Sequence, residues 1–158
     1  MLIDHVGIVV KRLEEGIANW SRLFGYVQST EPVLNSLQKV RVVFLEKKGS
    51  LPVKLLEPTD SSSPVWTFAL RGGGLHHLCF KVANLENELG RLVQEGARLL
   101  VHPQPGEAFE MEQIAFVYAG QGLNIELIDT EKRTCRCSAV SQNNKLTTPL
   151  PPPERGSQ

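Results

Sequence analysis

The sequence predicts an α+β fold made of two tandem β-α-β-β-β modules, because separate parts of the chain recur at one constant offset. The recurring pairs are residues 4–10 with 76–82, residues 42–44 with 114–116, and residues 53–56 with 125–128. The first pair aligns His5 with His77, so the offset is 77 − 5 = 72 residues. Three strand-like segments and a helix start at a single spacing indicate a duplicated module.

The first module, residues 1–58, begins with an apolar strand over residues 2–10. A helix is predicted over residues 13–24, where apolar side chains recur at helical spacing, and Gly25 is placed to end it. Alternating apolar segments predict two further strands, over residues 40–45 and 53–56.

A turn-rich connection over residues 57–64 and a short helix over 65–70 lead to the second module, residues 73–130. This module repeats the order of the first. Its elements are a strand over 75–82, a helix over 85–95 and strands over 98–101, 113–119 and 123–128. The two modules together form one predicted domain over residues 1–130. Residues 131–158 are polar and Pro-rich, and we expect a flexible tail there without a catalytic role.

The composition is that of an ordinary globular domain, with 158 residues, 41% hydrophobic and 22% charged. The formal net charge of zero gives no electrostatic basis for binding nucleic acid or an anionic membrane. No apolar run approaches the roughly 20 residues of a membrane span, and no signal-peptide pattern is present, so we expect a cytoplasmic location. Three cysteines, Cys79, Cys135 and Cys137, are expected to be reduced.

Strand alternation sorts the candidate site residues by face. His5 and His77 occupy equivalent strand positions and point away from the face that the helices cover. Lys54 and Glu126 are also equivalent, since 126 − 54 = 72, and each lies between aliphatic residues. Two imidazoles and one carboxylate suit a divalent transition metal. A buried Lys54–Glu126 ion pair is the alternative, because it would satisfy both groups without a metal. His76 is expected on the helix-facing side, either as a structural residue or as one that supports a metal ligand.

These residues also carry a resemblance to the vicinal oxygen chelate (glyoxalase/bleomycin resistance/dioxygenase) superfamily, and within it to the methylmalonyl-CoA epimerase family. The matching motifs are His5-Val6-Gly7-Ile8-Val9-Val10, Leu55-Leu56-Glu57-Pro58, Ser63-Pro64-Val65, Gly73-Gly74-Leu75-His76-His77-Leu78-Cys79-Phe80 and Ile125-Glu126-Leu127. They are distributed over residues 3–129. The Gly-Gly-x-His-His motif with its Ser-Pro neighbour is the most specific of them.

The resemblance implies a glyoxalase-like fold, in which the paired modules form an open half-barrel around one divalent metal such as Co, Mn, Zn, Ni or Fe. It implies His5, His77 and Glu126 as the ligands of that metal. In the epimerases the metal stabilises an enolate, which forms when a base removes a proton beside a thioester carbonyl. Homodimers are common in the superfamily, so association of this chain is an open alternative.

Three positions depart from the epimerase pattern. Lys54 replaces a Gln or Glu at the metal, and Leu37 aligns with a glutamate that serves as one of two bases. Residues 108–112 replace a small glycine-rich loop with a bulkier acidic one. Losing a base should block two-base epimerisation unless Glu110 or Lys54 takes its place.

Three functions are therefore open. The first is a metal-dependent isomerase, epimerase or lyase acting on a small carboxylate or acyl-CoA. Glu126 and Lys54 would be its catalytic residues, and Lys39 and Arg41 would bind the anionic substrate. A solvated strand face is the alternative interpretation of Lys39 and Arg41. The second is an Fe(II) extradiol-type dioxygenase, which uses the same two-histidine, one-carboxylate set. The third is a metal-free ligand-binding relative, which the Lys54–Glu126 pair and the missing base favour.

Overall fold

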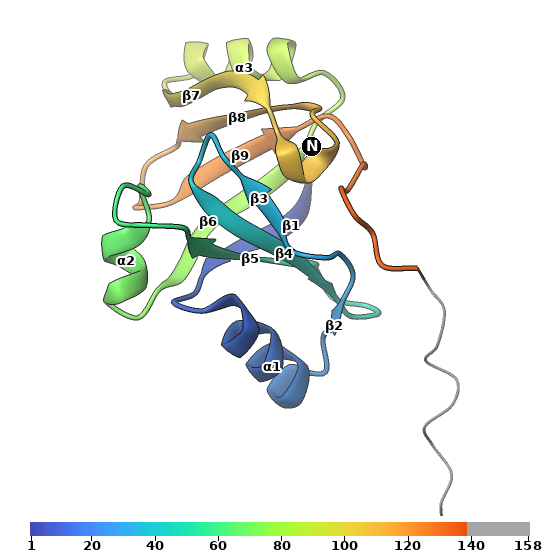
Figure 1. Cartoon of the computed structure of the whole chain (residues 1–158). Coiled ribbons are helices and arrows are strands. Elements are labelled where there is room, and N and C mark those ends of the chain that lie inside the picture. Colours follow the sequence, from blue (N-terminus) through green and yellow to red (C-terminus); the bar gives the residue numbers. More distant parts are fainter. Residues whose placement is uncertain (139–158) are drawn as a thin grey trace, which may run out of the picture.

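The structure is a computed structural model that describes residues 1–138 (Figure 1). The first module contains β1 (Leu2–Val9), α1 (Leu13–Phe24), β2 (Val27–Gln28), β3 (Val33–Asn35), β4 (Val40–Glu46) and β5 (Val53–Pro58). The short helix α2 (Trp66–Leu70) connects it to the second module. That module contains β6 (Gly74–Lys81), α3 (Leu85–Gln94), β7 (Arg98–Pro105), the 3-10 turn η1 (Glu107–Phe109), β8 (Gln113–Tyr118) and β9 (Asn124–Ile128).

Within residues 1–138, nine strands form one open sheet with the order β2-β4-β5-β1-β6-β9-β8-β7, and β3 pairs with β4. The antiparallel pair β1–β6 joins the two modules at the centre. On either side of it, β1 pairs in parallel with β5, and β6 pairs in parallel with β9. The two halves therefore have the same topology, which confirms the α+β fold of two tandem modules.

The helices cover the outer face of the sheet, one helix per module (Figure 1). Leu13 of α1 packs against Val43, Leu45 and Leu55, and Leu85 and Leu89 of α3 pack against residues of β8 and β9. The inner faces of the two modules share a third cluster, which includes Val42, Phe44, Phe109, Phe116 and Ile128. This inner cluster encloses the candidate site. None of the described helices is long and apolar enough to cross a membrane.

The duplication extends to the way each helix begins. The carboxylate of Glu57 accepts a hydrogen bond from the backbone N–H of Leu13 at 2.7 Å, and Asp129 accepts one from Leu85 at 3.1 Å. Both partners are related by the repeat, since 129 − 57 = 72 and 85 − 13 = 72. A carboxylate at these positions satisfies a free N–H of the first helical turn and complements the helix dipole. Glu57, which resembled a turn residue in the sequence, therefore caps α1.

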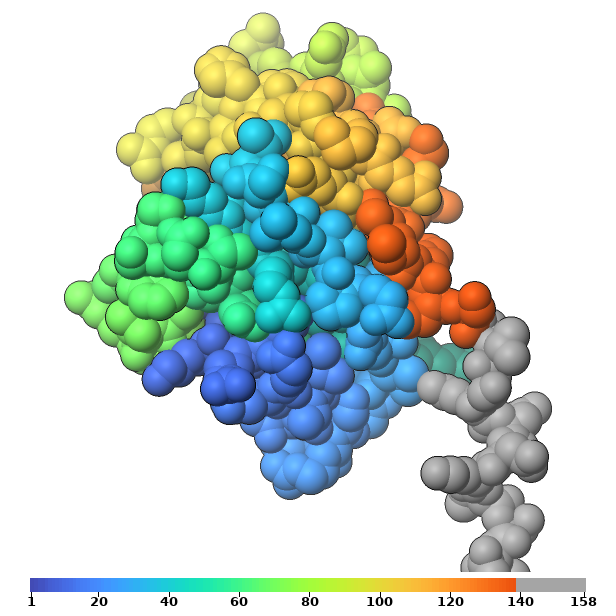
Figure 2. Space-filling model, viewed as in Figure 1, coloured from blue at the N-terminus to red at the C-terminus, as the bar shows by residue number. Residues whose placement is uncertain are grey.

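Three features differ from the sequence expectation. The short strands β2 and β3 are additional, and β7 continues to Pro105 because register shifts accommodate the extra residues opposite β8. The segment after β9 also turns back along the first module, where Thr30 and Arg136 form a β-bridge (Figure 2). Residues 139–158 of the expected tail lie outside the described residues.

Candidate metal centre

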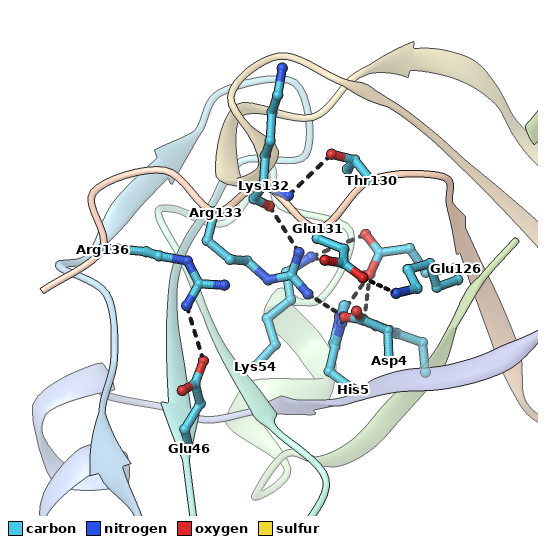
Figure 3. Close-up of polar contacts among 12 residues, drawn as sticks. Asp4, His5, Glu46, Lys54, Glu126, Thr130, Glu131, Lys132, Arg133 and Arg136 are labelled. Carbon is cyan, nitrogen blue, oxygen red and sulfur yellow. Dashed lines mark hydrogen bonds and ion pairs between the residues drawn. The ribbon is translucent and has the colours of Figure 1, made fainter. Parts of the chain in front are cut away.

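Four ionisable side chains meet inside the half-barrel, one from each strand that flanks the centre of the sheet. His5 comes from β1, Lys54 from β5, His77 from β6 and Glu126 from β9, and each has 0% relative exposure. The strand register brings them together, because Gly7 lies opposite both Lys54 and His77, and Cys79 lies opposite both His5 and Glu126. Figure 3 shows His5, Lys54 and Glu126 converging.

The two imidazoles approach the same carboxylate oxygen. Nε2 of His5 lies 3.0 Å from Oε2 of Glu126, and Nε2 of His77 lies 3.1 Å from it. Neither contact has hydrogen-bond geometry, and neither Nε2 atom has a hydrogen-bond partner in the described part of the chain. Two donors that each lie about 2.1 Å from a metal are about 3.0 Å apart at a right angle. The spacing and the unsatisfied nitrogens therefore fit a metal held by His5, His77 and Glu126.

The other ring nitrogen of each histidine, Nδ1, has a polar partner. Nδ1 of His5 donates to Oδ2 of Asp4 at 2.6 Å. Nδ1 of His77 lies 2.8 Å from Nδ1 of His76, so one of the two donates to the other. A proton on Nδ1, which the Asp4 carboxylate favours for His5 and which His77 carries when it is the donor to His76, keeps the lone pair of Nε2 available, as metal-ligating histidines require.

The fourth residue of the centre is a cation. Nζ of Lys54 lies 3.1 Å from Oε1 and 3.3 Å from Oε2 of Glu126. The same ammonium lies 4.8 Å from the centre of the Phe109 ring and 5.8 Å from that of Phe44. A protonated Lys54 competes with a divalent metal for Glu126, whereas a neutral Lys54 presents a further nitrogen donor.

Burial and charge set the protonation states of the centre. Burial lowers the pKa of His77 to about 4, so its imidazole is neutral at pH 7. Burial alone would raise the pKa of Glu126, but the nearby Lys54 ammonium and the His77 ring outweigh it and hold the pKa well below its usual range. Burial raises the pKa of the Cys79 thiol well above its usual value. At neutral pH the centre therefore combines the Glu126 carboxylate with a neutral His77 imidazole.

Gly7 makes room for the ring of His77. A Cβ atom at position 7 would lie 2.1 Å from Cε1 of His77 and 2.4 Å from both ring nitrogens. No side chain tolerates such contacts, so only glycine lets the imidazole occupy this place between β1 and β6.

A cavity of about 170 Å³ adjoins the centre on the side of His76 and Phe116. Its walls are mainly apolar, with side chains of Val40, Leu56, Val65, Leu100, Val101 and Phe116. Gln38, His76 and Asn124 add polar groups to the lining. The ring of Phe116 lies 5.5 Å from that of His77, and His76 contacts His77 directly, so two residues of the cavity wall contact a proposed metal ligand.

His76 lies in the cavity lining, and the expectation of a helix-facing residue was wrong. The pairing of β1 with β6 shifts in register between Gly7–His77 and Ile8–Leu75, so His76 is the extra residue of a bulge. A bulge interrupts strand alternation, which is why the face of His76 could not be assigned from spacing.

The structure does not bring the predicted substrate-binding residues to the cavity. Arg41 points to the helix-covered face, where it pairs with Glu57 at 3.4 Å and Glu14 at 3.1 Å. Lys39 is exposed and donates to Ser62 at 2.7 Å. Leu37 has no ionisable group, and Glu110 is exposed, so neither supplies a base at the buried centre.

Sequence reasoning missed three residues around the centre. Asp4 contacts His5, Phe109 packs over Lys54, and Arg133 packs on Phe109 and pairs with Asp4. The neighbouring acid Asp4 could have been noticed as a partner for His5. Arg133 carried no signal, because it lies in a polar segment without periodicity.

Known proteins resemble this chain in sequence and fold. The chain is 26% identical over 133 residues to the mitochondrial methylmalonyl-CoA epimerase of Dictyostelium discoideum, with 83% of this chain and 78% of the relative covered. A crystal structure of methylmalonyl-CoA epimerase from Mycobacterium tuberculosis has 30% identity and a TM-score of 0.71, over 80% of this chain and 85% of that chain. A methylmalonyl-CoA epimerase in complex with methylmalonyl-CoA and NH4+ has 27% identity and a TM-score of 0.70, over 80% of this chain and 92% of that chain.

A broader family match covers most of the described domain. The sequence profile of the Glyoxalase/Bleomycin resistance protein/Dioxygenase superfamily matches residues 4–116, which include both histidines of the centre and Lys54. The chain therefore belongs to the Glyoxalase/Bleomycin resistance protein/Dioxygenase superfamily.

Proposed function

We propose that this protein is a metal-dependent, epimerase-like isomerase that acts on a small carboxylate or acyl-CoA thioester through an enolate. The observation that carries the proposal is the pair of unsatisfied Nε2 atoms, each about 3 Å from one Glu126 oxygen. The relatives that are methylmalonyl-CoA epimerases support the same class of reaction.

His5, His77 and Glu126 would hold the metal. When bound, a divalent metal supplies Lewis-acid polarisation of the thioester carbonyl and lowers the energy of the enolate. Lys54 is the proposed base, because in its neutral form it can take the proton from the carbon beside the carbonyl. The resulting ammonium is balanced by Glu126 at 3.1 and 3.3 Å until the proton is returned.

The cavity indicates the kind of acyl group that would bind. A cavity of roughly 150 Å³ lined by aliphatic and aromatic groups holds one benzene molecule, and the cavity beside His77 has a volume of about 170 Å³. Its apolar walls favour a hydrophobic acyl substituent of about six carbon atoms. Gln38 and Asn124 provide polar groups for the carbonyl end.

Deuterium exchange tests the proposal. The metal-loaded protein is incubated in D2O with acyl-CoA thioesters of increasing chain length, and deuterium beside the carbonyl is measured by mass spectrometry. We expect exchange that disappears in Glu126→Gln and Lys54→Met and persists in Lys48→Met, which changes an exposed lysine. Absence of exchange with every thioester, in protein shown to contain metal, would refute the proposed reaction.

The contact between Lys54 and Glu126 favours a second candidate function. If Lys54 stays protonated, its ammonium occupies the place of a metal, and the protein binds a ligand in the same cavity without chemistry. Calorimetric binding of an acyl-CoA in the presence of a chelator, without exchange or turnover, would identify this function.

A further inference from the structure

The first part of the expected tail is built into the fold. We call residues 131–138 the C-terminal strap. Its backbone joins both modules: the N–H of Thr134 donates to the carbonyl of Ala108 at 3.0 Å, and that of Cys137 donates to Ser29 at 2.9 Å. The N–H of Glu31 donates back to Cys135 at 2.9 Å. These bonds fix the path of the strap along the surface of both modules (Figure 2).

Arg133 is the residue of the strap that points inward. It has 8% relative exposure, and its guanidinium lies 4.7 Å from the centre of the Phe44 ring and 4.9 Å from that of Phe109. These are the same two rings that face the ammonium of Lys54. Arg133 therefore closes the space beside the candidate metal centre.

One carboxylate connects Arg133 to the centre. Nη2 of Arg133 donates to Oδ2 of Asp4, and the same oxygen accepts from Nδ1 of His5 at 2.6 Å (Figure 3). The side chain of Asp4 has only 13% relative exposure, so a carboxylate there needs a compensating cation. Arg133 supplies that cation. Its hydrogen bond also fixes the orientation in which the Asp4 carboxylate accepts the hydrogen bond from His5.

We propose that Arg133 is a positioning residue, which holds Asp4 so that His5 keeps its proton on Nδ1 and directs the lone pair of Nε2 into the centre. Its consequence for metal binding rests on the proposed function above, whereas its effect on the His5 ring does not. Partners that orient a metal-ligating histidine usually contribute 10- to 100-fold to metal affinity.

Two variants of the full-length chain test the role. Arg133→Met keeps an apolar stem against Phe44 and Phe109 but removes the guanidinium. Arg136→Met is the matched control, because Arg136 lies in the same strap with an exposed side chain that pairs with Glu46 at 3.4 Å. The first measurement is the 15N NMR spectrum of His5 in the metal-free protein at pH 8, assigned by comparison with His5→Gln. The second is calorimetric titration with Zn²⁺.

We expect one Nδ1-protonated form of His5 in the unchanged protein and in Arg136→Met, and a mixture of both tautomers in Arg133→Met. Affinity for Zn²⁺ should be about 10- to 100-fold lower in Arg133→Met. An unaltered His5 spectrum in folded Arg133→Met would overturn the proposal and leave Arg133 a packing residue.

The two proposals fail in different ways. If the unchanged protein binds no metal but Arg133→Met alters the His5 tautomer, the positioning role stands and the metal-dependent function falls. If Arg133→Met does not fold, Arg133→Leu gives the same comparison, because it also removes the guanidinium and keeps an apolar side chain beside Phe44 and Phe109. An unaltered His5 spectrum in that variant contradicts the proposal equally.

Discussion

Lys54 and Glu126 occupy the same position in the two modules, 72 residues apart, and the ammonium of one contacts both carboxylate oxygens of the other. The duplication thus places a base and an acid at one buried point, next to two histidines. Whether this point holds a metal or an ion pair depends on the charge of one side chain. The most direct experiment is therefore to remove the charge of Lys54 by mutation.

Replacing Lys54 by Gln should strengthen metal binding. A unit charge about 4 Å from another contributes roughly 1–4 kcal/mol at effective dielectric constants between 80 and 20, so removing it should raise the affinity for Co²⁺ or Zn²⁺ at least about fivefold. Isothermal titration calorimetry measures this, with the exposed Lys48→Gln as the control. Weaker binding in Lys54→Gln would instead identify a neutral Lys54 as a ligand.

Gly7→Ala should displace the His77 ring, since the new methyl group would lie 2.1 Å from Cε1. Overpacking of this kind typically costs about 1–3 kcal/mol of unfolding free energy, and metal affinity should fall with it. Gly90→Ala is the control, because a Cβ atom there meets nothing within 4 Å. Urea unfolding and metal titration of both variants check the prediction, and equal behaviour would contradict the described packing.

The metal-free protein should lose stability as the pH falls below 6.5. The pKa of His77 is about 4 in the fold and near 6.5 when unfolded, so between these values only the unfolded chain takes up the proton. The full shift corresponds to about 3 kcal/mol. The lowered pKa of Glu126 adds to the loss at more acidic pH, through and below the ordinary carboxylate range.

Urea unfolding with a chelator at pH 7.0 and 4.5 measures this dependence. His77→Gln should reduce the difference in unfolding free energy between pH 7.0 and 4.5. His102→Gln, which changes an exposed histidine, should leave this difference unchanged. The same pH dependence in His77→Gln as in the unchanged protein would show that another group is responsible.

Filling the cavity should weaken ligand binding without altering the metal centre. Val101→Phe adds a ring to the cavity wall, whereas Val93→Phe adds one to an exposed position of α3. We expect at least about tenfold weaker binding of a hydrophobic acyl-CoA to Val101→Phe, because its acyl group loses apolar contact area. Calorimetry with an acyl-CoA and then with Zn²⁺ separates the two effects, and unchanged acyl-CoA affinity would place the ligand elsewhere.

The repeat made much of this molecule predictable. A constant offset assigned equivalent strands, and strand alternation placed His5, His77, Lys54 and Glu126 on the inner face, where the structure brings them together. The pair of Lys54 with Glu126, an alternative to the metal in the sequence, is a contact in the structure.

Strand alternation did not predict side-chain directions where the backbone is irregular. His76 faces the cavity because of a bulge in β6. Lys39 has a φ of 53°, a left-handed conformation that breaks the pleat before β4 begins, so strand alternation through this position does not predict the face of Arg41. Arg133 reaches Asp4 across 129 residues of sequence, and no local pattern reports such a contact.

The metal content of untagged protein, purified without chelator and measured by elemental analysis, tests the central claim most directly. The account predicts about one transition metal per chain, lost in His5→Ala and kept in His102→Ala. Metal-free protein that acquires metal only after Lys54→Gln would contradict it, because Lys54 would then have replaced the ion.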